Sequence, residues 1–282
     1  MESVIGIDIG GTNIRAGVVK DLAVINSASK KINSKGSKEE VFEELFEVID
    51  AVMDKGIAAI GIGVPSVVDL DSGVAYEVQN IPSWDIVPLK ERVEGKYKLP
   101  VLVNNDANCF ALGEYHFGKG KGYNNMIGLN IGTGLGAGII LNGKLYCGSN
   151  CGAGEFGMVP YLDKHTEYYA SGQFFRNVYQ ADGAEVFEKA KAGDKKAIEM
   201  FNELGYHLGN AFKTILYTFD PEIIIVGGSL KNAWEFYSDA LKQQLNTFVF
   251  SRSVLKLHTG ISELENCGVL GAAALHFDEI IK

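Results

Sequence analysis

Two similar glycine-rich stretches, roughly half a chain apart, constrain the fold more than any other feature. The first, IGIDIGGTNIRAGVV, runs from Ile5 to Val19, and the second, IGLNIGTGLGAGII, runs from Ile127 to Ile140. Each joins an alternating apolar strand to a second apolar run through clustered glycines, which is the pattern of a β-hairpin. The repetition predicts that each of two domains contributes one such hairpin.

Glycine turns of this kind are suited to binding anions. A glycine lets the backbone approach a ligand closely, and successive N–H groups then point into one concavity. We therefore expect the two hairpins to face each other across a cleft and to hold a polyphosphate, although two ordinary hairpins remain the alternative. The residues expected to bind phosphate in the turns are Gly10, Gly11, Thr12, Asn13, Gly132, Thr133 and Gly134.

Asp8 lies where the first strand meets its turn, and Asn130 has the equivalent position in the second copy. A carboxylate beside a triphosphate is repelled unless a cation separates the two. Asp8 therefore predicts Mg²⁺, bound through water. Arg15 is a candidate charge partner on the second strand of the hairpin.

Composition argues against several classes of function. The net charge of −9 argues against non-specific nucleic-acid binding, which depends on cationic side chains. The chain passes from Met1 directly into a strand pattern without a signal peptide, and no apolar run approaches the ~20 residues that span a bilayer. Four cysteines are few for 282 residues and favour a reducing, cytoplasmic location. Cys147 and Cys151 are close enough to suggest a metal, but a matched second pair is lacking.

Strand and helix patterns alternate, which predicts an α/β protein. Ser37 and Glu40 form a capping box for a helix that Gly56 ends. The turn-rich stretch from Ser66 to Asp85 is expected to be an excursion from the core. Towards the C-terminus we expect helices near 232–248 and 268–281 and a strand near 254–258.

Five motifs occur in an order and spacing that resemble the ROK family of sugar kinases and sugar-responsive repressors. They are DIGGTNIRAGVV, VNNDANCFALGE, NIGTGLGAGII, GAGEFG and DPEIIIVGG, and they cover essentially the whole chain. The resemblance implies an α/β, two-domain actin/Hsp70/hexokinase-like fold with an ATP cleft between the domains. It implies an N-terminal domain of residues 1–117, joined by the C-terminal helix 268–282, and a C-terminal domain of residues 118–267.

By the same resemblance, Asp106 is the catalytic base. An attacking hydroxyl needs a carboxylate within hydrogen-bond reach, and phosphoryl transfer otherwise depends on positioning and charge neutralisation. Taken without the resemblance, Asn and Asp at a strand–helix junction would indicate helix capping. The sugar-binding residues that the resemblance implies are Ser66, Asn80, Asn105, Asp106, Glu155 and Glu167, and the glycines that border adenosine are Gly227 and Gly228.

One departure from the family pattern is large. The family commonly has a histidine after its GEFG-like motif and then a CxCGxxGC motif, which together hold a structural zinc. Here Met158 replaces that histidine, and the segment between Glu155 and Glu167 contains no cysteine. We therefore predict no structural zinc. We also suggest, as a hypothesis, that packing of Tyr161, Tyr168 and Tyr169 stiffens the segment instead.

The leading hypothesis is ATP-dependent phosphorylation of a hexose on its 6-hydroxyl, with glucose first and N-acetylmannosamine, fructose and other sugars open. A sugar-sensing repressor is the second hypothesis, but the first hairpin begins by Val4 and leaves no room for an N-terminal helix-turn-helix. An ATPase or chaperone of the same fold is the third. A homodimer is expected only by resemblance, and the phosphate donor stays open.

Overall fold

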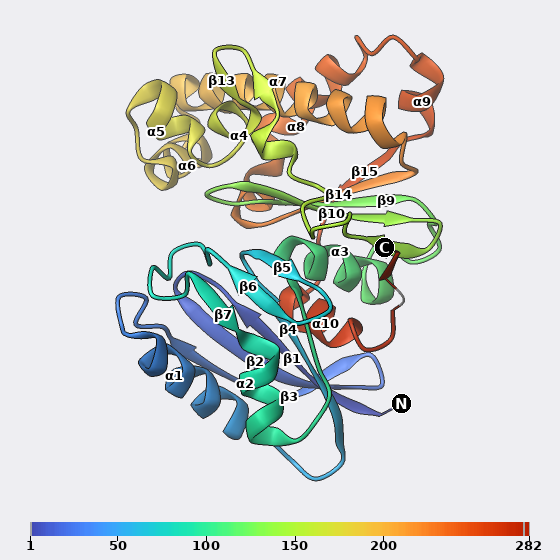
Figure 1. Cartoon of the computed structure of the whole chain (residues 1–282). Helices are drawn as coiled ribbons and strands as arrows, with labels where there is room; N and C mark the ends of the chain where they lie inside the picture. The colour runs from blue at the N-terminus through green and yellow to red at the C-terminus, as the bar shows by residue number, and fades with distance from the viewer. Residues whose placement is uncertain (1, 279, 282) are drawn as a thin grey trace. The chain divides into compact units, whose positions relative to one another are not determined.

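The computed structural model describes residues 2–278 and residues 280–281 (Figure 1). The chain divides into two compact units. Unit 1 comprises Met1–Asn124, Gly138–Ala153 and Glu263–Lys282, and unit 2 comprises Asn125–Ala137 and Gly154–Ser262. The expected division into one domain of residues 1–117 with helix 268–282 and a second domain of residues 118–267 stays a prediction.

Unit 1 is built on a five-stranded sheet with the order β3-β2-β1-β4-β8. Strands β1, β4 and β8 are parallel, and β2 pairs antiparallel with both β1 and β3. The bounds of the elements are β1 Ser3–Ile9, β2 Asn13–Lys20, β3 Ala23–Lys31, α1 Lys38–Asp50, β4 Ile57–Val64, α2 Leu89–Tyr97, β8 Val101–Asn105, α3 Asp106–Phe117 and α10 Cys267–Ala274. The expected capping box at Ser37 and Glu40 is present at the start of α1.

Helix α10 packs closely against α3 and the sheet of unit 1, on the side away from α1 and α2 (Figure 1). Small residues make this contact possible. A Cβ added to Gly61 would stand 1.8 Å from the carbonyl oxygen of Ala272, and one added to Gly271 would stand 1.6 Å from that of Cys109. Val4, Val19 and Val269 belong to the apolar cluster beside these contacts.

The turn-rich excursion forms a small antiparallel sheet with the order β5-β6-β7. Its strands are β5 Val67–Asp69, β6 Val74–Tyr76 and β7 Ile86–Pro88. Trp84 is fully buried beneath it and contacts Phe42 of α1, with the ring centroids 5.0 Å apart. The excursion is therefore anchored by an aromatic contact with the main layer of unit 1.

Unit 2 combines parallel strands with the long helix α7, which packs along α8. A six-stranded sheet has the order β15-β14-β9-β10-β11-β16, and the boundary between the units falls inside β10. The bounds in unit 2 are β9 Met126–Ile131, β12 Pro160–Tyr161, β13 Lys164–His165, α4 Thr166–Tyr169, α5 Phe174–Tyr179, α6 Gly183–Lys191, α7 Lys195–Phe219, β14 Ile223–Gly227, α8 Trp234–Leu245, α9 Ser251–Lys256 and β15 His258–Ile261; short 3₁₀ turns, η1 and η2, cover Phe156–Met158 and Ser229–Ala233. Strand β10, Leu135–Leu141, crosses the boundary, and β11 Lys144–Tyr146 and β16 Ile280–Ile281 belong to unit 1.

Two expectations near the C-terminus are wrong. A strand was expected near 254–258, but helix α9 runs to Lys256 and the strand β15 begins only at His258. The final helix ends at Ala274 rather than near 281, and Ile280–Ile281 pairs with β11 instead, while residue 279 lies outside the described residues. Within the described part of the chain, no helix has both the length and the apolar character needed to cross a bilayer.

Candidate active site

Three parallel strands of unit 1 end side by side and carry the polar residues predicted for catalysis. Asp8 of β1 lies opposite Gly63 of β4, and Gly63 lies opposite Asn104 of β8. Asn105 is the last residue of β8, and Asp106 is the first residue of α3. In α/β proteins, ligands bind at the carboxyl ends of parallel strands. The structure therefore brings Asp8, Asn105 and Asp106 to one such edge of unit 1.

Asn105 is the residue that caps helix α3. Its Oδ1 atom accepts hydrogen bonds from the backbone N–H groups of Ala107 at 2.8 Å and Asn108 at 3.4 Å. Its Nδ2 atom donates to the backbone carbonyl of Ser66 at 3.2 Å. Asp106 follows in the first turn, half-buried, and its Oδ1 atom accepts a hydrogen bond from the N–H of Ala107 at 2.9 Å. Both side chains thus contribute to the cap, and the roles of Asn105 as a sugar ligand and of Asp106 as a base stay predictions.

The buried thiol of Cys109 lies within electrostatic reach of both carboxylates. Burial raises the pKa of Cys109, and the negative charges of Asp106 and Asp8 raise it further. A Cβ added to Gly63 would stand 3.1 Å from Cys109 Sγ. The charges of Asp8 and Asp106 therefore both influence the thiol of Cys109, near the carboxyl ends of the parallel strands.

Asp8 is a partly buried carboxylate beside Arg15. Burial raises the pKa of Asp8, and the guanidinium of Arg15, 3.6 Å from the carboxylate, opposes that rise by lowering the pKa. The side chain of Arg15 is 55% exposed, so water screens its charge. A bound cation would stabilise the ionised form of Asp8. The environment of Asp8 therefore fits the predicted Mg²⁺.

The first glycine turn, residues 10–12, is closed by a backbone hydrogen bond from Gly10 N–H to the carbonyl of Asn13 at 2.9 Å. Asn80 lies against this turn, because a Cβ on Gly11 would stand 2.8 Å from Asn80 Nδ2. Thr12 is exposed. The predicted phosphate-binding residues of the first hairpin and the predicted sugar contact Asn80 therefore lie together in unit 1.

The hydroxyl of Ser66 is engaged with the backbone. The Oγ atom of Ser66 accepts from the N–H of Tyr76 at 3.0 Å. The carbonyl oxygens of Val67 and Tyr76 each lie 2.8 Å from the same Oγ atom, within reach of its proton. These contacts hold β6 against the segment that follows β4. The carbonyl of Ser66 also accepts from Asn105, so the two residues are in contact, and a sugar contact of Ser66 stays a prediction.

Gly132 and Thr133 of the second glycine turn, residues 132–134, line a cavity of about 640 Å³ within unit 2. The N–H of Gly132 bonds to the carbonyl of Gly134 at 3.0 Å and closes the turn. The other lining side chains include the aromatic and apolar groups of Phe175, Phe187, Phe201 and Leu230 and the polar groups of Gln173 and Arg176. Backbone N–H groups suit phosphate, and apolar walls suit a base. The cavity therefore has the chemistry of a nucleotide site.

Gly227 and Gly228 lie next to this cavity. Gly227 ends β14 opposite Asn130 of β9, and Gly228 has a φ of 75°, which favours glycine. A Cβ on Gly228 would stand 2.2 Å from the carbonyl oxygen of Ile131. The following residue, Ser229, lines the cavity.

The two predicted sugar-binding glutamates are close to each other in unit 2. Glu167 Oε2 accepts from the N–H of Leu135 at 2.8 Å, and Glu167 Oε1 accepts from Gln173 Nε2 at 3.1 Å. Partial desolvation raises the pKa of Glu155, and the negative charge of Glu167 raises it further. Neighbouring carboxylates of this kind can accept hydrogen bonds from adjacent hydroxyls.

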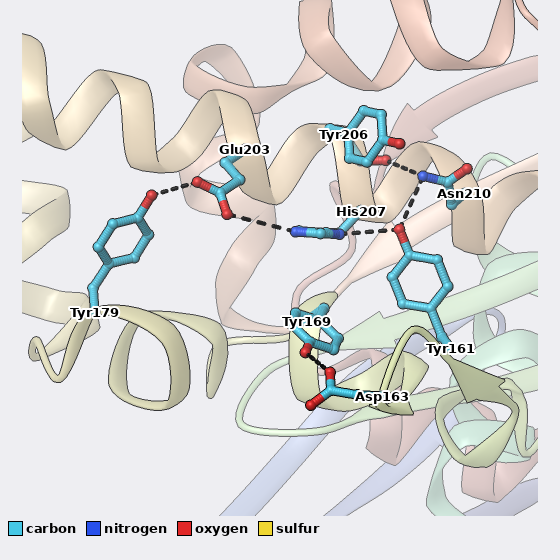
Figure 2. Close-up of polar contacts among 8 residues, drawn as sticks. All are labelled: Tyr161, Asp163, Tyr169, Tyr179, Glu203, Tyr206, His207 and Asn210. Atoms are coloured by element: carbon cyan, nitrogen blue, oxygen red, sulfur yellow. Dashed lines mark hydrogen bonds and ion pairs between the residues drawn. The ribbon is translucent and has the colours of Figure 1, made fainter.

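The segment 156–166 is joined to helix α7 by a chain of hydrogen bonds (Figure 2). Asn210 Nδ2 donates to Tyr161 Oη at 3.0 Å, and Tyr161 Oη lies 3.1 Å from His207 Nδ1. Because Asn210 supplies a donor to the Tyr161 oxygen, we assign the hydroxyl proton to the bond with Nδ1. His207 then carries its own proton on Nε2, which faces Glu203 Oε1 at 3.7 Å.

The three tyrosines singled out from the sequence do cluster. Ring centroids are 4.8 Å apart for Tyr168 and Tyr169 and 5.8 Å apart for Tyr161 and Tyr169, and His207 lies 5.1 Å from Tyr169. Burial lowers the pKa of His207, which favours the neutral ring. That this cluster stiffens the segment stays a prediction.

Cys147 and Cys151 come together with two asparagines rather than with further metal ligands. Their sulfur atoms lie 3.6 and 3.8 Å from Asn108 Nδ2, and both also contact Asn104 Oδ1. A hydrogen bond from the Cys147 thiol lowers the pKa of Cys151. No group of three or more His, Cys, Asp or Glu side chains is placed to hold a metal ion within the described residues. The lack of a structural zinc stays a prediction.

Sequence reasoning missed several side chains that line the cavity, including Gln173, Arg176 and Asn232. These residues lie in segments with helical or turn-like patterns. Such patterns do not distinguish a side chain that lines a cavity from one on the outer surface. The only available signal was the position of Gln173 shortly after the predicted ligand Glu167.

The model of the ROK family matches residues 4–279. The chain belongs to the ROK family. It is 32% identical to a glucokinase of Streptomyces coelicolor, with 96% of each chain covered. It is 30% identical to an N-acetyl-D-glucosamine kinase of Pasteurella multocida, with 96% of this chain and 98% of the relative covered.

A solved ROK structure extends the match to three dimensions. It is a glucokinase from Streptomyces griseus in complex with glucose and AMPPNP, 29% identical, with a TM-score of 0.82 and with 97% of this chain and 98% of that chain covered. This similarity confirms the expected α/β, two-domain, hexokinase-like fold and the resemblance on which that expectation depended.

Proposed function

We propose that this ROK protein is an ATP-dependent sugar kinase that phosphorylates the 6-hydroxyl of a hexose, with glucose as the first candidate substrate. The observation that carries the proposal is the position of Asp106, a carboxylate at the start of α3 on the same sheet edge as Asp8. Relatives named as glucokinase and N-acetyl-D-glucosamine kinase support the sugar-kinase activity.

In the proposed reaction, Asp106 accepts the proton of the sugar hydroxyl while the hydroxyl oxygen attacks the γ-phosphorus of ATP. The bond between that phosphorus and the β–γ bridging oxygen breaks, and ADP leaves with the electron pair. A positioned general base typically contributes ~10²–10⁴-fold to rate. The remaining acceleration comes from orientation and from donors that neutralise phosphate charge.

The cavity of unit 2 is the proposed nucleotide site. The N–H groups of Thr133 and Gly134 would bind phosphate oxygens, and Phe175 and Leu230 would contact the base or ribose. Asp8 would hold Mg²⁺ through water, because a bound cation would stabilise the ionised carboxylate that burial disfavours and that the screened charge of Arg15 stabilises only weakly. When bound, Mg²⁺ supplies charge neutralisation on the phosphates.

Glu155 and Glu167 are the proposed ligands of the sugar hydroxyls, together with Asn105, Asn80 and Ser66. The bound glucose of the S. griseus glucokinase supports glucose as first candidate. N-acetylmannosamine, fructose and other hexoses or amino sugars are the alternatives, because hydroxyl stereochemistry is read by the geometry around these carboxylates.

A coupled assay of ADP release across a panel of hexoses and amino sugars tests this proposal. We expect turnover with one sugar well above the rate without sugar, and the product should carry its phosphate on oxygen 6 by phosphorus-coupled carbon NMR. Saturable sugar binding without any turnover would instead favour a non-catalytic sensor. Nucleotide hydrolysis that no sugar accelerates would contradict the kinase assignment.

A further inference from the structure

The segment from Glu167 to Gln173 is hydrogen-bonded along its length to the second glycine turn. The N–H of Gly172 donates to the carbonyl of Gly132 at 2.8 Å. Ser171 Oγ lies 2.9 Å from the carbonyl of Thr133, and Glu167 Oε2 accepts from the N–H of Leu135 at 2.8 Å. Three contacts in succession therefore join this segment to both sides of the turn.

The carboxylate of Glu167 occupies space that a side chain would fill on other residues. A Cβ added to Gly134 would stand 2.6 Å from Glu167 Oε2, and one added to Gly157 would stand 3.4 Å from the same atom. The carboxylate is thus held between two glycines, the N–H of Leu135 and the amide of Gln173. Glu167 is therefore in direct contact with Leu135, the residue that follows the turn.

Ser171 lies at the centre of this junction and is fully buried. Its Oγ atom faces two carbonyls, those of Thr133 at 2.9 Å and Glu167 at 2.8 Å, and accepts from the N–H of Gln173 at 3.2 Å. One hydroxyl therefore connects the glycine turn, the proposed sugar ligand and the start of α5. An alanine would fit the same space but would leave these buried carbonyls with one donor fewer.

The same segment forms a wall of the cavity. Gly172 and Gln173 line it together with Gly132 and Thr133 of the turn. A single stretch of seven residues, 167–173, thus carries a proposed sugar ligand at one end and contacts the proposed nucleotide site at the other. A ligand that orders either end reduces the conformational freedom that the second ligand would otherwise have to remove.

We propose that Ser171 is a positioning residue that couples sugar binding to nucleotide binding in this protein. The proposal rests on the proposed function, because it takes Glu167 as a sugar ligand and the cavity as the nucleotide site. Sugar bound at Glu167 fixes the junction, and the N–H groups of Thr133 and Gly134 are then already oriented when the phosphates arrive. Coupling between two sites is reciprocal, so the nucleotide tightens sugar binding by the same factor.

Titration calorimetry with AMPPNP tests the coupling, with and without a saturating concentration of the sugar that gives turnover. In the parent protein, we expect the sugar to tighten AMPPNP binding by about fivefold or more, the lower end of typical coupling. In Ser171→Ala the factor should fall below about twofold. Ser238→Ala, at another buried serine of unit 2, is the matched control and should keep the parent factor.

Hydrogen exchange of the parent protein gives a readout that does not depend on a variant folding. Sugar alone should slow amide exchange in a peptide that covers residues 130–136. Unchanged exchange there, or a Ser171→Ala protein that retains the full factor, would overturn the proposal. Independent binding of both ligands would also overturn the coupling while leaving the kinase function intact. Failure of the parent protein to bind either ligand would overturn the function itself.

Discussion

At the scale of single residues, neighbours with similar side chains have different roles. Asn105 Oδ1 accepts from the N–H groups of Ala107 and Asn108 and its Nδ2 atom donates to the carbonyl of Ser66, whereas the half-buried carboxylate of Asp106 accepts from the N–H of Ala107. The pattern NND predicted both capping and catalysis, but residue type alone does not say which side chain has which role. The division depends on backbone direction, which changes from strand at Asn105 to helix at Asp106.

Glu155 should make sugar binding sensitive to pH. Its pKa is raised above the ordinary value by partial desolvation and by the charge of Glu167. The ionised form accepts sugar hydroxyls, so protonation as pH falls should raise KM for the sugar, beginning at a pH above the ~4.3 at which an ordinary glutamate titrates. Steady-state kinetics between pH about 7 and about 5 would measure this effect.

Glu155→Gln is the control for that measurement. The variant should bind the sugar more weakly, and its sugar KM should depend less on pH. KM for ATP should change little with pH in either protein. A sugar KM that stays constant across the range in the parent protein, or the same acid limb in the variant, would show that another group is responsible.

At the scale of elements, the hairpin β12–β13 depends on α7 for its position (Figure 2). Tyr161→Phe removes the hydroxyl that contacts both His207 and Asn210, and His207 is buried. Leaving a buried ring nitrogen without this partner should cost about 1–3 kcal/mol of the free energy of unfolding. Urea denaturation would measure the loss.

Tyr206→Phe provides the comparison on the same helix. Tyr206 is 49% exposed, and substitutions at such positions usually change stability by less than about 0.5 kcal/mol. Equal stability losses in the two variants would mean that the contact with His207 contributes nothing specific to the position of the hairpin.

Elements were predictable where one local signal dominated. The capping box at Ser37 and Glu40 and the two glycine hairpins were predicted in type and approximate position. The apolar residues of 251–256 have no such signal, because β-branched and leucine side chains occur in both strands and helices. There, the parallel pairing of His258–Ile261 with β14 decides where the strand begins.

At the scale of the whole molecule, unit 1 is assembled from segments far apart in the sequence. Helix α10 contacts β1, β4 and α3, although more than 140 residues separate it from the nearest of them. The sequence contained the small residues that permit this packing, but no local pattern identifies their partners. The family resemblance therefore contributed what spacing could not.

Gly271→Ala should disrupt this assembly. The added Cβ would stand 1.6 Å from the carbonyl oxygen of Cys109, so α10 or α3 must move. Overpacking of a close contact typically costs about 1–3 kcal/mol, and here we expect the upper end or more. Gly95→Ala in α2 has no atom within 4 Å of the added Cβ and should instead stabilise unit 1 by about 0.5–1 kcal/mol. Matching urea midpoints for the two variants would contradict the close packing of α10.

The most direct measurement of the central claim compares the parent protein with Asp106→Asn. The substitution keeps the size of the side chain but removes the proton acceptor, so kcat should fall by about 10²–10⁴-fold while the dissociation constant for the sugar, measured by calorimetry, changes by less than about threefold. If the variant turns over at close to the parent rate with sugar bound, Asp106 is not the base, and the account of this site is wrong.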